Sequence, residues 1–60
     1  MKYITLFEYE ECLGTALTKL ERQVNKHIEI GFKPLGGVSI YSAFNDLSYV
    51  AQAMIKEEEE

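Results

Sequence analysis

The sequence predicts a single α+β domain of βαββ type, a three-stranded antiparallel sheet with one helix packed on one face. Three observations lead to this prediction. A run rich in β-branched and aromatic residues opens the chain, an apolar stripe with helical spacing follows, and two more strand-like runs come after a glycine-rich turn. Sixty residues suffice for one domain, which we place at residues 1–56, and we expect the acidic tail at residues 57–60 to be disordered.

The first strand is expected at residues 3–7, where the run Tyr-Ile-Thr-Leu-Phe favours an extended backbone. A helix is expected next, because five apolar residues recur at steps of four, three, four and four: Leu13, Leu17, Leu20, Val24 and Ile28. The sequence allows two start positions for this helix. Thr15 could cap a helix that begins at Ala16, or Thr18 and Glu21 could form a capping box further along. Gly31 follows the stripe and suits the left-handed position after a helix.

Two strands are expected after the helix, at residues 38–41 and 47–56, with a loop at residues 43–46 in which Asp46 suits a turn. Pro34 cannot donate a ladder hydrogen bond, so it should lie at the beginning of its strand or on an edge. The pair Gly36-Gly37 indicates a bulge, or a place where another backbone or a ligand approaches closely. We expect the last strand to be central, because all neighbouring strands are then antiparallel.

Both faces of the expected sheet carry apolar side chains, which predicts assembly. On the last strand, Val50 and Met54 oppose Tyr49 and Ile55. One helix covers one face, and an apolar face of roughly several hundred Å² is too large to leave in water. A chain of this length also buries only about 60% of its unfolded surface, so its core is small. We therefore expect a homo-oligomer.

Composition narrows the function classes. Cys12 is the only cysteine and His27 the only histidine, so neither an internal disulfide nor a Cys/His zinc cluster can form, and no cofactor is expected. The net charge of −4 reflects the tail, because four of the ten acidic residues lie there and the other six balance six basic residues. A neutral body argues against nucleic-acid binding. No stretch approaches the roughly 20 apolar residues of a membrane span, and we expect a cytoplasmic protein.

The candidate ligand-binding residues form two groups. Gly36 and Gly37 could offer backbone amides to an anion, with Lys33 nearby, although a structural bulge would use the same glycines. On the expected helix, three basic residues form a ridge that could bind an anion or simply face solvent: Lys19, Arg22 and Lys26.

No catalytic arrangement emerges, and we expect a protein that is not an enzyme. His27 has no second catalytic group indicated beside it, so we expect it at an interface or rim. Cys12 is expected to be a packed thiol. Three aromatic residues could stack a flat ligand but suit a hairpin core better: Tyr41, Phe44 and Tyr49.

Three blocks of the chain resemble a known family. They are the pair Val24-Asn25 on the Leu-rich helix, the run Gly-Phe-Lys-Pro-Leu-Gly-Gly-Val at residues 31–38, and Gln-Ala-Met at residues 52–54. Together they are similar to the short bacterial and phage domains called domain of unknown function 1737, in which Trp is common where this chain has Phe32. The resemblance covers residues 16–56. It implies a βαββ fold and a bacterial or phage setting, and it brings no activity.

Two functional classes follow. In the first, the oligomer binds or sequesters a small anionic, nucleotide-like ligand in a pocket between subunits, by analogy with small phage proteins that sequester nucleotide immune signals. In the second, the chain is an interaction or inhibitor module that acts on a host protein through its sheet face or acidic tail. The glycine pair and the basic ridge favour the first class, because a plain protein interface requires neither.

Overall fold

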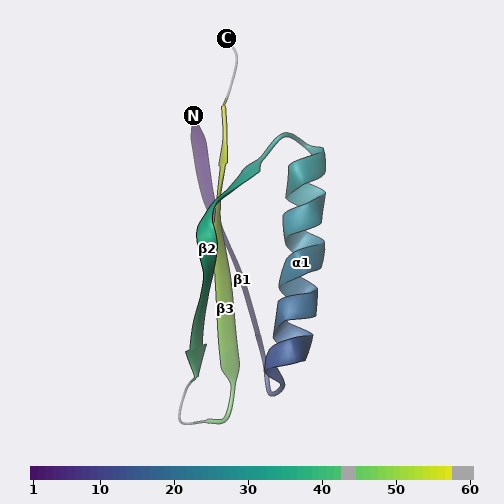
Figure 1. Cartoon of the computed structure of the whole chain (residues 1–60), viewed down its shortest axis with the longest axis vertical. Coiled ribbons are helices and arrows are strands. Elements are labelled where there is room, and N and C mark those ends of the chain that lie inside the picture. The colour runs from purple at the N-terminus through teal and green to yellow at the C-terminus, as the bar shows by residue number, and fades with distance from the viewer. Residues whose placement is uncertain (43–44, 58–60) are drawn as a thin grey trace.

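The computed structural model describes residues 1–42 and 45–57 and has the predicted βαββ order. Its elements are β1 (Lys2–Glu10), α1 (Leu13–Glu29), β2 (Lys33–Ser42) and β3 (Ser48–Lys56). The sheet is antiparallel with the order β1-β3-β2, so β3 is central as predicted (Figure 1). The predicted loop at residues 43–46 and the acidic tail fall partly outside the described residues, which include Asn45, Asp46 and Glu57.

The first two strands are longer than the sequence indicated. β1 continues to Glu10 because Glu8 and Glu10 lie on the side of α1, where their carboxylates accept hydrogen bonds from Gln23 and Lys19. β2 begins at Lys33 rather than at residue 38. Its second residue is therefore a proline on an edge strand, which confirms both predicted positions of that proline.

The helix begins earlier than either predicted start. Cys12 is its N-cap residue, no side chain caps it, and the amide of Ala16 donates to the Cys12 carbonyl at 3.0 Å. Thr18 lies inside the helix, and its hydroxyl donates to the Gly14 carbonyl at 2.9 Å. Both predicted caps, at Thr15 and at Thr18 with Glu21, are wrong. Only Glu11 and Cys12 separate the end of β1 from the first residue of α1.

The end of the helix is as predicted. Gly31 has a φ of +100°, in the left-handed region that follows many helices, and its amide donates to the Ile28 carbonyl at 3.0 Å. The next amide, of Phe32, donates to the His27 carbonyl at 2.9 Å. This turn places the Phe32 ring in the core below the last turn of α1.

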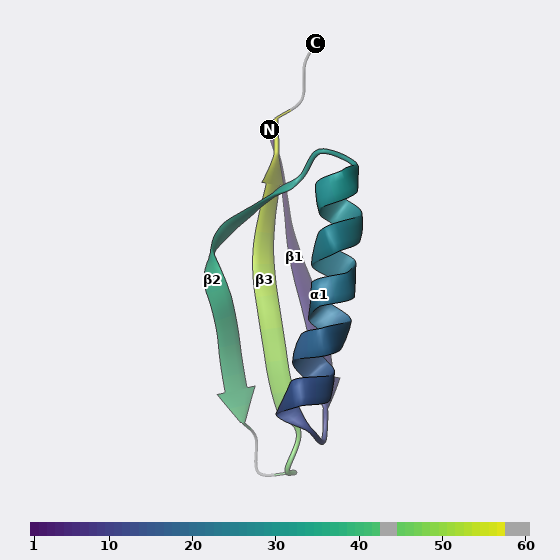
Figure 2. The ribbon, with the colours of Figure 1, turned by 45° about the vertical axis from the view of Figure 1, so that its right-hand side comes forward.

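A small core lies between α1 and the sheet. Its buried side chains alternate along the strands and recur on one face of the helix, as expected for an amphipathic element on a half-covered sheet: Leu6, Ala16, Leu20, Phe32, Val50 and Met54. α1 packs mainly on β1 and β3, and β2 stands away from it (Figure 2). The helix therefore covers only part of the face that it packs on.

β2 contains the predicted bulge. Leu35 pairs with Ala53 and Ser39 with Ala51, so residues 36–38 of β2 lie opposite the single residue Gln52. Gly36 takes a φ of +75°, which an L side chain rarely adopts. The Gln52 side chain is buried, and its amide nitrogen lies 3.1 Å from the Gly36 carbonyl and 3.4 Å from the Leu35 carbonyl. The glutamine thus binds carbonyls of the bulge from inside the fold.

Candidate functional site

β2 is the most exposed strand of the sheet. All ten of its residues are exposed, whereas β3 has buried side chains at alternate positions. Ile40, on the side of α1, is 55% exposed, and Tyr41, on the opposite side, is 64% exposed. The strand therefore offers apolar surface on both of its faces.

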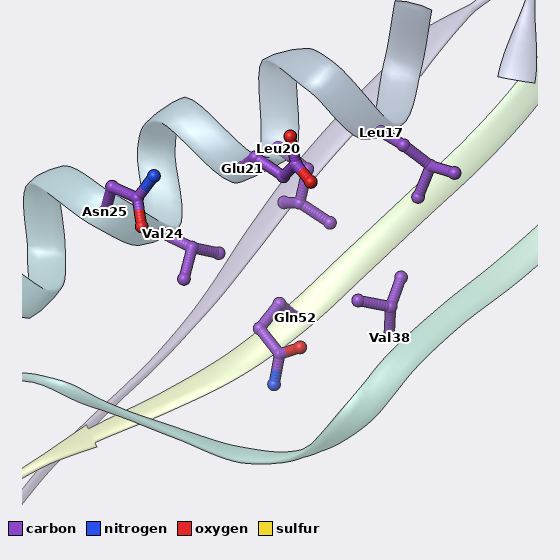
Figure 3. A pocket seen from close by; sticks show the side chains of 7 residues that line it. All are labelled: Leu17, Leu20, Glu21, Val24, Asn25, Val38 and Gln52. Carbon is purple, nitrogen blue, oxygen red and sulfur yellow. The ribbon is translucent and has the colours of Figure 1, made fainter. Parts of the chain in front are cut away.

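A groove lies between α1 and β2, on the side of the sheet that carries the helix. Its volume is about 450 Å³, within the usual range of small-ligand pockets. Figure 3 shows Val38 and Gln52 on the strands, across from the helix side chains. The lining is mostly apolar with three polar groups: Leu17, Leu20, Glu21, Val24, Asn25, Val38 and Gln52.

The opposite side of the sheet carries an aromatic cluster. The register places Tyr9, Tyr49 and Tyr41 side by side on the three strands. The ring of Tyr49 is centred 5.7 Å from that of Tyr9, 6.1 Å from that of Tyr41 and 6.0 Å from that of Phe7. These distances are typical of interacting aromatic pairs, so the four rings form one continuous surface. The predicted third member, Phe44, lies outside the described residues.

The six predicted ligand-binding residues lie on two separate elements. Lys33, Gly36 and Gly37 belong to β2, and the three basic residues belong to α1. None of the six lines the groove beside β2, where α1 contributes Glu21 and Asn25. A second hollow, of about 500 Å³ beside the first turns of α1, contains two of the basic residues, Lys19 and Arg22. Within one chain, the two predicted groups are therefore not brought together in either hollow.

Lys19 already has a partner. Its ammonium group forms an ion pair with the Glu10 carboxylate, and this hydrogen bond raises the pKa of Lys19. Glu8 adds a weaker effect in the same direction. The pair is exposed to solvent and contributes little to stability, but it directs the Lys19 charge toward β1 and away from β2.

The two glycines of the bulge face open space. A Cβ atom built on Gly36 or on Gly37 would meet no atom within 4 Å. No close approach of another part of the described chain explains the pair. Gly36 is explained by its positive φ, and Gly37 has a φ that other residues adopt.

His27 has a structural role at the end of the helix. Its Nδ1 lies 2.7 Å from the Gln23 carbonyl, which can only accept, so Nδ1 carries the proton. The imidazole meets the Phe32 ring edge-on, with centroids 5.5 Å apart, and the Lys56 ammonium lies 5.7 Å from the centroid of the same phenyl ring. These contacts fix the phenylalanine on which the last helical turn rests.

Cys12 is exposed, which contradicts the expectation of a packed thiol. It precedes the first turn of α1, where the backbone amide of Thr15, then its hydroxyl, then the Gly14 backbone lower the pKa of Cys12. Burial of the thiol and the charge of Glu10 act weakly in the opposite direction. The early helix start explains the exposure, since Cys12 sits at the tip of the turn after β1.

Two features of the structure were not predicted from the sequence. The role of Gln52 depends on the bulge across from it, and the only signal was a polar residue on the buried side of a strand. Tyr9 lay beyond the predicted end of β1, although it continues the alternation of Tyr3 and Phe7. Asp46 has a φ of +60°, and the neighbouring Asn45 side chain accepts from the Leu47 amide at 3.3 Å, which confirms the predicted turn.

Comparison of the chain with protein-family models, with curated proteins and with solved structures finds no match in any of the three. The similarity to domain of unknown function 1737 therefore stays a prediction. Over residues 1–42 and 45–57, no three His, Cys, Asp or Glu side chains are placed to hold a metal ion. In the same part of the chain, no helix has the length and apolar character needed to cross a bilayer.

Proposed function

We propose that this chain is a cytoplasmic, non-enzymatic binding module that functions as a homo-oligomer, with protein–protein contact as its primary activity. The exposure of β2 carries the proposal, because all ten of its residues are exposed and its side chains opposite α1 include Leu35 and Tyr41, which are 49% and 64% exposed. Phe7 and Tyr9 of β1 lie on the same face of the sheet and are exposed as well. A contiguous apolar surface of this kind marks an interaction site on a folded protein.

The core supports the same proposal. Over residues 1–42 and 45–57 its buried apolar side chains number six, and the single cysteine of the chain cannot form an internal disulfide. Domains of this length gain little stability from their own core, and oligomerisation is one of the usual compensations. Association through the face opposite α1 would bury the outward side chains of β2 and would stabilise the fold at the same time.

The other protein partner that we consider is a host protein that binds to the sheet face or to the acidic tail. The aromatic rings on the sheet face favour such a contact, since tyrosine is enriched at interfaces. Removal of residues 57–60 would weaken the binding of a partner that contacts the tail and would leave self-association unchanged.

Binding of a small anionic, nucleotide-like ligand between subunits is the second candidate function. Arg22, Lys26 and Lys33 favour it, because they are exposed and form no ion pair with the described residues. The open space around Gly36 and Gly37 leaves their backbone accessible. Since neither hollow of one chain brings Lys33 together with the basic residues of α1, a site that uses both groups would combine residues from two copies.

Native mass spectrometry of the full chain separates these functions. We expect a multimer, and a multimer that stays bare in a nucleotide mixture supports protein contact as the primary activity. A stoichiometric gain in mass would instead support the ligand function, and Arg22→Glu or Lys33→Glu should then abolish the gain while the subunit count is kept. A monomer at all concentrations would contradict the homo-oligomer.

A further inference from the structure

The outer face of the sheet, which we define as the face opposite α1, is a nearly uncharged surface. The strand register arranges it as four cross-strand rows of three residues. In order along the sheet the rows are Tyr3, Ile55 and Lys33; Thr5, Ala53 and Leu35; Phe7, Ala51 and Ser39; and Tyr9, Tyr49 and Tyr41. Lys33 is the only charged residue among them, and it lies in the row at one end.

The exposed aromatic side chains of this face supply more than half of the area that one side of a standard interface buries. Tyr3 is 61%, Phe7 52%, Tyr9 52% and Tyr41 64% exposed. Aromatic side chains offer about 150–250 Å² each, so these four alone expose about 450 Å². Leu35 and the half-buried residues of β3 add to this area. For comparison, each partner buries roughly 800 Å² in a standard interface.

The chemistry of the face selects the class of partner. A phosphate backbone or an anionic lipid surface requires clustered cations, and the face has one lysine. Homodimer interfaces are more apolar than other protein interfaces and are depleted in charge at their centre. The two central rows of the outer face are uncharged, in agreement with that composition.

The stability of the fold favours a second copy over a different protein. α1 covers one side of the sheet, and a sheet normally buries its second apolar face against another layer. A partner that completes this layer is needed whenever the chain is folded. Another copy of the chain is the one partner that is present wherever the chain folds.

We propose that the outer face packs against the outer face of a second copy, in a two-fold dimer of face-to-face sheets. This inference rests on the homo-oligomer proposed above and assigns its interface. Each substitution in such a dimer acts twice, because the same patch contributes from both chains. Two sheets of this kind pack about 10 Å apart, with their side chains interdigitated.

Neighbouring residues of β2 give a matched test. Tyr41 points to the outer face and Ile40 to the side of α1, both are more than half exposed, and both lie on the same strand. We expect Tyr41→Lys to raise the dimer dissociation constant about 100-fold or more, since buried tyrosines dominate such interfaces. We expect Ile40→Lys to leave it within about threefold. Sedimentation equilibrium measures both.

The outcomes distinguish the inference from the proposed function. Dissociation by Ile40→Lys, with Tyr41→Lys still dimeric, would overturn the outer face as interface and would keep the homo-oligomer. A wild-type chain that is monomeric at all concentrations would overturn both. If Tyr41→Lys fails to fold, hydroxyl-radical footprinting of the unmodified chain decides. Tyr3, Tyr9 and Tyr41 should gain protection as concentration rises, and unchanged labelling in a proven oligomer would contradict the inference.

Discussion

β2 and β3 are neighbouring strands of nearly equal length, yet they have opposite environments. Val50, Gln52 and Met54 of β3 are buried beneath α1, whereas every residue of β2 is exposed. Composition does not explain this contrast, since both strands carry apolar residues on both faces. The contrast arises from the width of the sheet, because one helix spans β1 and β3 and leaves the third strand uncovered.

The contrast indicates which strand tolerates substitution within one copy and which does not. β3 holds the fold together, so its side chains determine stability within one copy. β2 contributes hydrogen bonds to the sheet but little buried surface. Its apolar side chains become useful only when another molecule covers them, which is why we assign the binding function to this part of the molecule.

Truncation of a core side chain should give the largest contrast. Met54 is fully buried, and Met54→Ala should lower the free energy of unfolding by about 2–5 kcal/mol through lost burial and a cavity. Ile40→Ala removes a comparable side chain from β2 and should change it by at most about 0.5 kcal/mol. Urea denaturation measures both. Equal losses would show that β2 is already buried on the side of α1.

Gln52 connects the two strands, and its removal should have an intermediate effect. Gln52→Leu introduces an apolar side chain of similar size and leaves the carbonyls of Leu35 and Gly36 without this donor. We expect a loss of about 1–3 kcal/mol in the free energy of unfolding. Amide hydrogen exchange should accelerate around residues 35–39 more than elsewhere. A variant as stable as the wild type would contradict the role of Gln52 in the bulge.

The two glycines of the bulge should differ by a smaller amount. Gly36→Ala forces an L side chain into a positive φ and should cost about 1 kcal/mol. Gly37→Ala meets open space with an ordinary φ and should be neutral or slightly stabilising. Thermal denaturation of the two variants compares them directly. A larger cost at Gly37 would indicate that another chain approaches this glycine in the oligomer.

The smallest expected effect concerns Cys12, far from both strands. Its lowered pKa predicts that iodoacetamide alkylation rises with pH at lower values than for a free thiol. Because the folded pKa lies below the unfolded one, the thiolate favours the folded state at pH above the unfolded value. This contribution is lost as pH falls through the folded pKa. If the alkylation rate of the folded chain had the same pH dependence as that of the unfolded chain, the Thr15 amide would not lower the pKa of Cys12.

The order of elements and the faces of β3 could be predicted because they depend on local periodicity, and the strand order followed from requiring antiparallel neighbours. The stripe from Leu13 to Ile28 has helical spacing, and the alternation around Val50 has strand spacing. Gly31 and Pro34 marked their positions correctly because their backbone preferences are strong. These signals depend on residues close together in the sequence.

The candidate site was less predictable, because it depends on how the elements pack. Lys19 and Gly36 belong to different elements, and the rotation of α1 on the sheet decides whether they meet. Lys19 instead pairs with Glu10 on β1, and Glu21 faces the groove beside β2. The helix start was missed because no capping side chain marks it, since Cys12 is the N-cap residue and its side chain forms no cap hydrogen bond.

The dependence of the midpoint of thermal unfolding on protein concentration tests the central claim, that a second copy covers the exposed strand and its outer face. If folding and association are linked, the midpoint rises steadily as the concentration increases from roughly 1 to 100 μM, because mass action favours the folded dimer. Circular dichroism measures it without any modification of the chain. A midpoint that stays constant over this range would show that the single chain is stable alone, and would contradict the claim.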